Sequence, residues 1–212
     1  MTLKLREPIN STTHFAGALL SIVGLILLLK VSIESGDIIK ILSSIVFSLG
    51  LFGLYLTSSI YHGVYKNIVV FRKLDHIMIY FLIAASYTPI CLITLKGKVG
   101  YIMISIIWSL AIAGGIIKIF WLNAPRWLYT SFYLILGWAA IFIFYPLYKA
   151  LPTTALLLFI SGGLLYTIGA VIYATKSKKL KIWKFEFHEI FHVFILLGSL
   201  SHFLMIWKFV IS

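Results

Sequence analysis

The chain has 212 residues, of which 61% are hydrophobic and only 11% are charged, and its formal net charge is +12. This composition, with a mean hydropathy of +1.05, excludes an ordinary soluble domain and indicates an integral membrane protein. A single cysteine, Cys91, excludes an intramolecular disulfide and a cysteine-rich metal site. Any bound metal is therefore expected on histidine or carboxylate ligands.

Seven stretches of the chain are long and apolar enough to cross a bilayer as helices, which takes about 20 residues each. We expect these spans at residues 14–33, 39–62, 74–95, 99–121, 128–148, 153–174 and 188–210. The connections between them are too short to hold a separate soluble domain. The sequence therefore predicts an all-α fold, a seven-transmembrane-helix bundle in which residues 1–212 form a single integral membrane domain.

The distribution of positive charge predicts how the bundle is oriented. Twelve of the 18 Lys and Arg residues fall on the side of the N-terminus and six on the other. Because cytoplasmic loops carry the excess of Lys and Arg, we expect the N-terminus in the cytoplasm and the C-terminus outside, in a multi-pass protein of the cell (plasma) membrane. The basic loop at 176–184 is expected to touch anionic lipid headgroups rather than nucleic acid.

Five of the six histidines are expected at the cytoplasmic ends of spans. They are His14, His62, His76, His188 and His192. Asp75 lies at the same level, whereas His202 is about 15 Å deeper than His192 at about 1.5 Å per residue. Ionisable side chains inside a membrane usually face the bundle interior, where they pair or bind something. Their clustering at one depth, from separate helices, predicts a functional site.

The spacing of three histidines favours a metal site. His188 and His192 are four residues apart and share one helical face, and His62 supplies a third imidazole from another span. Three protein ligands with a fourth position left open are typical of catalytic zinc, which lowers the pKa of its bound water to about 7. At the same depth, Asp75 is a candidate general base. Ser58, one turn from His62, is a candidate donor to a developing oxyanion.

Simpler interpretations stay open for several of these residues. A lone buried histidine such as His14, His76 or His202 ordinarily hydrogen-bonds a carbonyl or a hydroxyl of a neighbouring helix. Ser58 could bond its own helix or act as a small packing residue. Asp75 could cap the third span or pair with Arg72 or Lys73.

The stretch HEIFH at 188–192 also matches the H-E-x-x-H pattern of zinc proteases, in which the glutamate is the base. The match is weak, because membrane proteases of this kind take a third ligand from a later span and no span follows here. Glu189 lies about 100° round the helix from His188. We therefore treat it as a candidate for supporting the ligands and not as the base.

Four segments together resemble a known family. EPINSTTH, SSIYH, KLDH and HEIFHVFILLGSLSHF look like the bacterial hemolysin III family, the prokaryotic branch of the progestin and adipoQ receptors. That group includes the adiponectin receptors and, more distantly, the alkaline ceramidases. The resemblance implies a zinc ion held near the cytoplasmic face by His62, His188 and His192. It also implies that Asp75 contacts the metal-bound water and that Ser58 is the motif serine.

The resemblance further implies an intramembrane hydrolase, so the leading hypothesis is a Zn²⁺-dependent, ceramidase-like enzyme that cleaves a lipid amide or ester bond. Two alternatives stay open. One is a membrane-lytic or pore-forming protein, although seven full-length spans leave a secreted toxin no plausible soluble form. The other is a receptor or sensor of membrane lipid state with a structural zinc. In each case the expected partner is a membrane lipid.

Overall fold

The computed structural model describes residues 4–176 and 181–212. Its segments are α1 (Pro8–Glu34), α2 (Ile38–Gly63), α3 (Ile68–Pro89), η1 (Ile90–Thr94), α4 (Lys98–Phe120), α5 (Arg126–Trp138), η2 (Ala139–Ile143), α6 (Phe144–Ala150), α7 (Thr153–Thr175), α8 (Phe187–Met205) and η3 (Ile206–Ile211). Within the described residues they make seven spans long and apolar enough to cross a membrane. The predictions of an all-α fold and of seven spans are confirmed.

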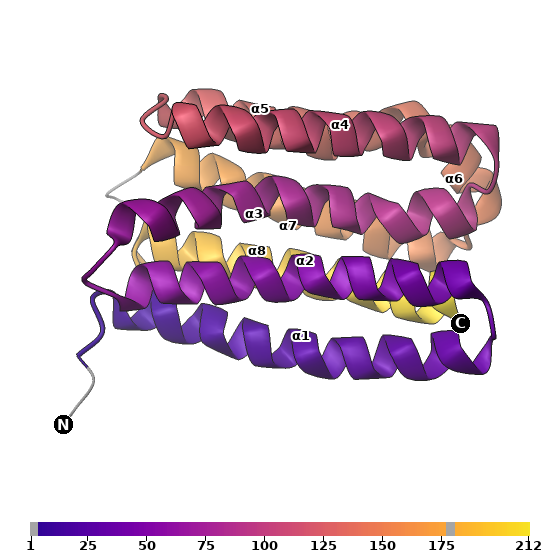
Figure 1. Ribbon diagram of the computed structural model, residues 1–212, viewed down its shortest axis with the longest axis horizontal. Helices are drawn as coiled ribbons and strands as arrows, with labels where there is room; N and C mark the ends of the chain where they lie inside the picture. Colours follow the sequence, from indigo (N-terminus) through magenta and orange to yellow (C-terminus); the bar gives the residue numbers. More distant parts are fainter. Residues whose placement is uncertain (1–3, 177–180) are drawn as a thin grey trace.

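The long helices lie side by side, and the two chain ends lie at opposite ends of the bundle (Figure 1). Each span contacts the next along the chain, and α8 packs against both α7 and α1, which closes the arrangement. We call the end where α2 finishes and where α3, α5 and α8 begin the N-terminal end of the bundle. Both stretches that carry the predicted metal ligands therefore meet at this end.

Two helices begin about six residues earlier than predicted. We expected starts at 14 and 74, but α1 begins at Pro8 and α3 at Ile68. Proline suits the first turn of a helix because its fixed φ is already helical and its missing N–H is not needed there. The first turns of α1 are polar, and in α3 the apolar start is followed by Arg72 and Lys73, so a hydropathy window begins later in both helices. As a result His14 and Asp75 lie about two turns inside their helices instead of opening them.

The fifth span is interrupted near its middle, where α5 gives way to the 3₁₀ segment η2. Tightening the helix there frees carbonyl groups that need other donors inside a membrane. The Tyr87 hydroxyl on α3 supplies one, donating to the Gly137 carbonyl at 2.6 Å and to the Leu136 carbonyl at 3.3 Å. The apolar pattern over residues 128–148 does not predict this break.

Two serines join α1 to α2 close to the end of α2. The Ser11 hydroxyl donates to the Ser59 carbonyl at 3.0 Å, and the Ser59 hydroxyl donates to the Ser11 carbonyl at 2.9 Å. Small hydroxyl residues allow helices in a membrane to approach closely and to bond across the interface. This reciprocal pair fixes the position of the last turn of α2, which carries His62.

The basic loop predicted at 176–184 is only partly described. Lys178 and Lys179 lie outside the described residues, whereas Lys181 and Lys184 are exposed. The contact of this loop with anionic lipid headgroups stays a prediction, and so does the orientation of the two termini across a membrane.

Candidate metal centre

The last turn of α2 and the first turns of α8 bring three imidazoles together. His62 comes from α2, and His188 and His192 come from one face of α8. One ring nitrogen of each lies within 4.8 Å of the corresponding nitrogens of the other two. The ring centroids form a nearly equilateral triangle with sides of 4.8, 4.9 and 5.0 Å. The structure thus places the three predicted ligands in one cluster.

The spacing of this cluster can be compared with that of a metal site. The His62 Nε2 and His188 Nε2 atoms are 3.3 Å apart. Two nitrogens bound to a tetrahedral zinc ion at about 2.0–2.1 Å would be about 3.3–3.4 Å apart. The His62–His188 pair therefore has the spacing of two metal ligands, and a ring nitrogen of His192 lies within 4.8 Å of both, so the three residues can hold a metal ion. Imidazole also suits copper, iron and nickel, so the donors by themselves indicate a transition metal without selecting zinc.

Asp75 and Ser58 lie beside the cluster. Both side chains line the cavity wall that His188 and His192 also line. Asn67 occupies the N-cap of α3, so the alternative that Asp75 caps this helix is wrong. Within the described residues, the Asp75 carboxylate has no ion pair with Arg72 or Lys73. The nearest basic side chain is His76, whose Nδ1 atom lies 3.9 Å from Asp75 Oδ2.

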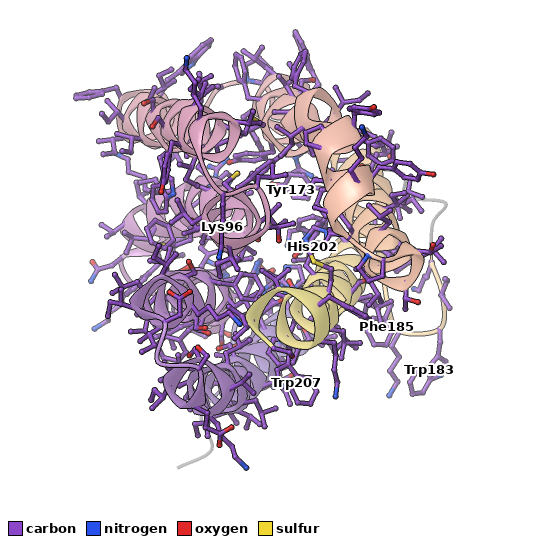
Figure 2. The ribbon with its side chains drawn as sticks, turned by 90° about the vertical axis from the view of Figure 1, so that its right-hand side faces the viewer. Lys96, Tyr173, Trp183, Phe185, His202 and Trp207 are labelled. Atoms are coloured by element: carbon purple, nitrogen blue, oxygen red, sulfur yellow. The ribbon has the colours of Figure 1, made fainter. Side chains whose placement is uncertain are left out.

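An interior cavity of about 430 Å³ starts at this cluster. Its wall at the N-terminal end includes Ser58, Asp75, His188 and His192, and its far part includes Phe144, Phe159 and His202. The rise along α8 from His192 to His202 makes this distance about 15 Å. In the end-on view of Figure 2, Tyr173 and His202 point into the bundle interior and Trp183 points outward. The cluster therefore lies at one end of a long, mostly apolar cavity.

The remaining histidines differ in their surroundings. The Nε2 atom of His202 bonds the Phe159 carbonyl of the neighbouring helix α7 at 3.1 Å, as expected for a lone histidine. The Nδ1 atom of His76 instead bonds the Arg72 carbonyl of its own helix at 2.7 Å. His14 differs, because neither of its ring nitrogens has a hydrogen-bond partner among the described residues. Its ring instead stacks on that of His192.

Two further residues reach the cluster and were not predicted. The Glu7 Oε2 atom is 2.6 Å from His62 Nδ1, and the Asn10 Nδ2 group donates to Glu7 Oε2 at 3.1 Å and to Glu189 Oε1 at 3.0 Å. The hydrogen bond from His62, opposed by burial, lowers the pKa of Glu7 from 4.5 to about 2. The only sequence signal for these residues was the segment EPINSTTH.

Glu189 takes part in the start of α8 and not in the histidine cluster. One of its oxygens accepts from the Glu186 amide at 3.0 Å, which completes a capping box, and the other accepts from Asn10. It is not among the converging ligand atoms. This placement agrees with a supporting role and disfavours the protease interpretation of HEIFH.

Fold and site together define a seven-helix membrane protein with three convergent histidines at one end of an interior cavity. The family model described as Haemolysin-III related matches residues 3–203, and the chain belongs to this family. It is 38% identical to Hemolysin-3 of Bacillus cereus, over 100% of this chain and 95% of that protein. It is 37% identical to the Hemolysin-3 homolog of Bacillus subtilis (strain 168), over 93% and 91%. Human monocyte to macrophage differentiation factor is 28% identical, over 94% and 82%.

Proposed function

We propose that the chain is a membrane-embedded hydrolase that holds Zn²⁺ on His62, His188 and His192 and cleaves an amide or ester bond of a lipid. One observation carries the proposal: three convergent imidazoles, a carboxylate and a hydroxyl share one end of an otherwise apolar cavity. Convergent polar groups in an apolar pocket are the usual mark of a catalytic or binding site.

The number of ligands supports a catalytic rather than a structural metal. Structural zinc is almost always enclosed by four protein ligands, whereas catalytic zinc has three and an open position. Three histidines converge among the described residues, and His14 is not one of them. When bound, zinc would supply Lewis-acid polarisation of a carbonyl and a lowered pKa for water.

Asp75 is the proposed proton carrier. The carboxylate lies on the cavity wall beside the cluster, where it can accept a proton from water as the water oxygen bonds to the carbonyl carbon of the substrate. The same proton then passes to the leaving nitrogen or oxygen as the bond to the acyl carbon breaks. Ser58, also on this wall, donates a hydrogen bond to the carbonyl oxygen as negative charge develops on it.

The cavity indicates which part of a substrate lies where. Its far part is walled by apolar side chains such as Phe144 and Phe159, which suit an acyl chain and no charged group. The carbonyl at the head of such a chain would then lie against the histidine cluster. Because most Lys and Arg residues fall on the N-terminal side, we propose that this end faces the cytoplasmic leaflet of the cell membrane.

The proposal is tested by incubating purified, zinc-loaded protein with long-chain ceramides, other N-acyl amides and acyl esters, and measuring released fatty acid by mass spectrometry. We expect release that stops when a chelator removes the metal and returns when zinc is restored. The matched control is the His188→Ala/His192→Ala variant. Fully metal-loaded protein that releases no fatty acid from any of these substrates would contradict the hydrolase and favour a sensor with a structural metal.

A further inference from the structure

The chain just before and at the start of α1 contacts both helices that carry the histidine cluster. We call Arg6, Glu7 and Asn10 the N-terminal clamp. The Glu7 amide donates to the His62 carbonyl at 2.9 Å, and the Arg6 amide donates to the Gly63 carbonyl at 3.2 Å. The last carbonyls of a helix have no partner within it, so these two bonds complete the end of α2.

The side chain of Glu7 holds the ring of His62 as well as its backbone. The Glu7 Oε2 atom lies 2.6 Å from His62 Nδ1, while His62 Nε2 faces His188 Nε2 at 3.3 Å. A carboxylate that accepts the Nδ1–H of an imidazole fixes its tautomer and its orientation and makes the opposite nitrogen a better metal ligand. The Arg6 guanidinium donates to the other Glu7 oxygen at 3.2 Å, which holds the carboxylate in place.

Asn10 extends this contact to α8. Its Nδ2 group donates one hydrogen bond to Glu7 and one to Glu189, and Glu189 also accepts from the Glu186 amide in the capping box. A continuous chain of bonds therefore connects His62 at the end of α2 with the first turn of α8, next to His188 and His192. These contacts set the spacing of the two helices at the level of the cluster.

We propose that Glu7 is a positioning residue of the metal centre and that Asn10 couples it to α8. The inference rests on the metal-binding part of the proposed function and does not depend on hydrolysis. Loss of such a partner behind a metal-bound histidine typically weakens metal binding about 10- to 100-fold. Glu7→Gln keeps the size of the side chain and the backbone contacts, but it removes the negative charge of the carboxylate that accepts the His62 Nδ1–H.

The test is the zinc affinity of the folded protein, measured by competition with a chelator of known affinity. We expect Glu7→Gln to weaken zinc binding by about 10- to 100-fold. Asn10→Ala leaves the Glu7 contact with His62 in place and should lose less affinity. The matched control is Glu34→Gln, at the exposed far end of α1, which should bind zinc like the wild type. Metal-free melting temperatures are measured alongside.

The outcomes separate this inference from the proposed function. A clamp that only joins helices would lower the metal-free melting temperature of Glu7→Gln and leave its zinc affinity within about twofold of the wild type, which would overturn the positioning role. If Glu7→Gln does not fold, unchanged zinc affinity in Asn10→Ala would overturn the coupling to α8. Wild-type protein that binds no zinc would overturn the metal centre and the clamp together, whereas tight binding without hydrolysis leaves the clamp standing.

Discussion

The rings of His14 and His192 are stacked, with centroids 3.6 Å apart and planes within 12° of parallel. His14 is only 3% exposed, and neither of its ring nitrogens has a partner among the described residues. Unpartnered buried polar atoms are costly, so the ring must contribute through packing. In this position His14 covers one face of His192 and restricts how its imidazole can turn.

Replacing His14 separates packing from metal ligation. His14→Phe keeps a flat ring against His192 and removes two unpartnered nitrogens, so we expect unchanged zinc content and an equal or higher melting temperature. His14→Ala leaves a void and should lower the free energy of unfolding by about 2–4 kcal/mol. Loss of zinc from a folded His14→Phe variant would instead identify a His14 nitrogen as a ligand.

Asp75→Asn tests the proposed proton carrier. The amide keeps the shape of the carboxylate but cannot accept a proton, so we expect turnover to fall about 10²- to 10⁴-fold while zinc stays bound. Fatty acid release and metal content are measured on the same preparation. Turnover that stays within about threefold of the wild type would remove Asp75 from the chemistry.

The helix boundaries show which features of the fold can be predicted from the sequence and which cannot. A hydropathy pattern detects long apolar stretches, so it found the seven spans. It missed the polar first turns of α1 and the first turn of α3, which Arg72 and Lys73 separate from the rest of the apolar run. The interruption between α5 and η2 depends on the Tyr87 hydroxyl of another helix, a contact that no local pattern contains. Element type and five of the seven starts were therefore predictable, whereas the starts of α1 and α3 and the break in the fifth span were not.

In the candidate site, too, the features set by local spacing were predictable and those set by tertiary packing were not. The four-residue spacing of His188 and His192 predicts that they share a helical face. The positions of His62 and Asp75 at the ends of predicted spans place them at the same end of the bundle. The contact of Glu7 with His62 depends on how the residues before α1 fold back over the end of α2, which is a tertiary arrangement. The stacking of His14 on His192 is likewise set by the packing of α1 against α8.

The glycine pair Gly162 and Gly163 on α7 tests the close approach of α7 and α8. A Cβ atom at Gly162 would overlap the His202 ring and meet the Gly198 carbonyl at 3.2 Å, whereas one at Gly163 would meet nothing within 4 Å. We expect Gly162→Ala to lower the free energy of unfolding by about 1–3 kcal/mol. Gly163→Ala should be neutral or stabilising, because alanine favours helix by up to about 1 kcal/mol. Equal melting temperatures for the two variants would contradict this packing.

The acid stability of the metal-free protein tests the environment of Glu7. Because the hydrogen bond from His62 lowers the pKa of Glu7 from 4.5 to about 2, the folded state favours the carboxylate. This stabilisation is present above pH 4.5 and is lost as the pH falls through about 2. The melting temperature of the wild type should therefore fall more steeply over this interval than that of Glu7→Gln. Since the Glu7 side chain is 40% exposed, we expect a modest difference. Parallel curves would contradict the contact.

The central claim is that His62, His188 and His192 hold a metal ion, and elemental analysis of detergent-purified protein tests it most directly. Protein never exposed to a chelator is compared with His188→Ala/His192→Ala and with His202→Ala, which alters a histidine at the far end of the cavity. We predict about one zinc per chain in the wild type and in His202→Ala, and none in the double variant. Wild-type protein that contains no metal, or a double variant that keeps it, would contradict the account.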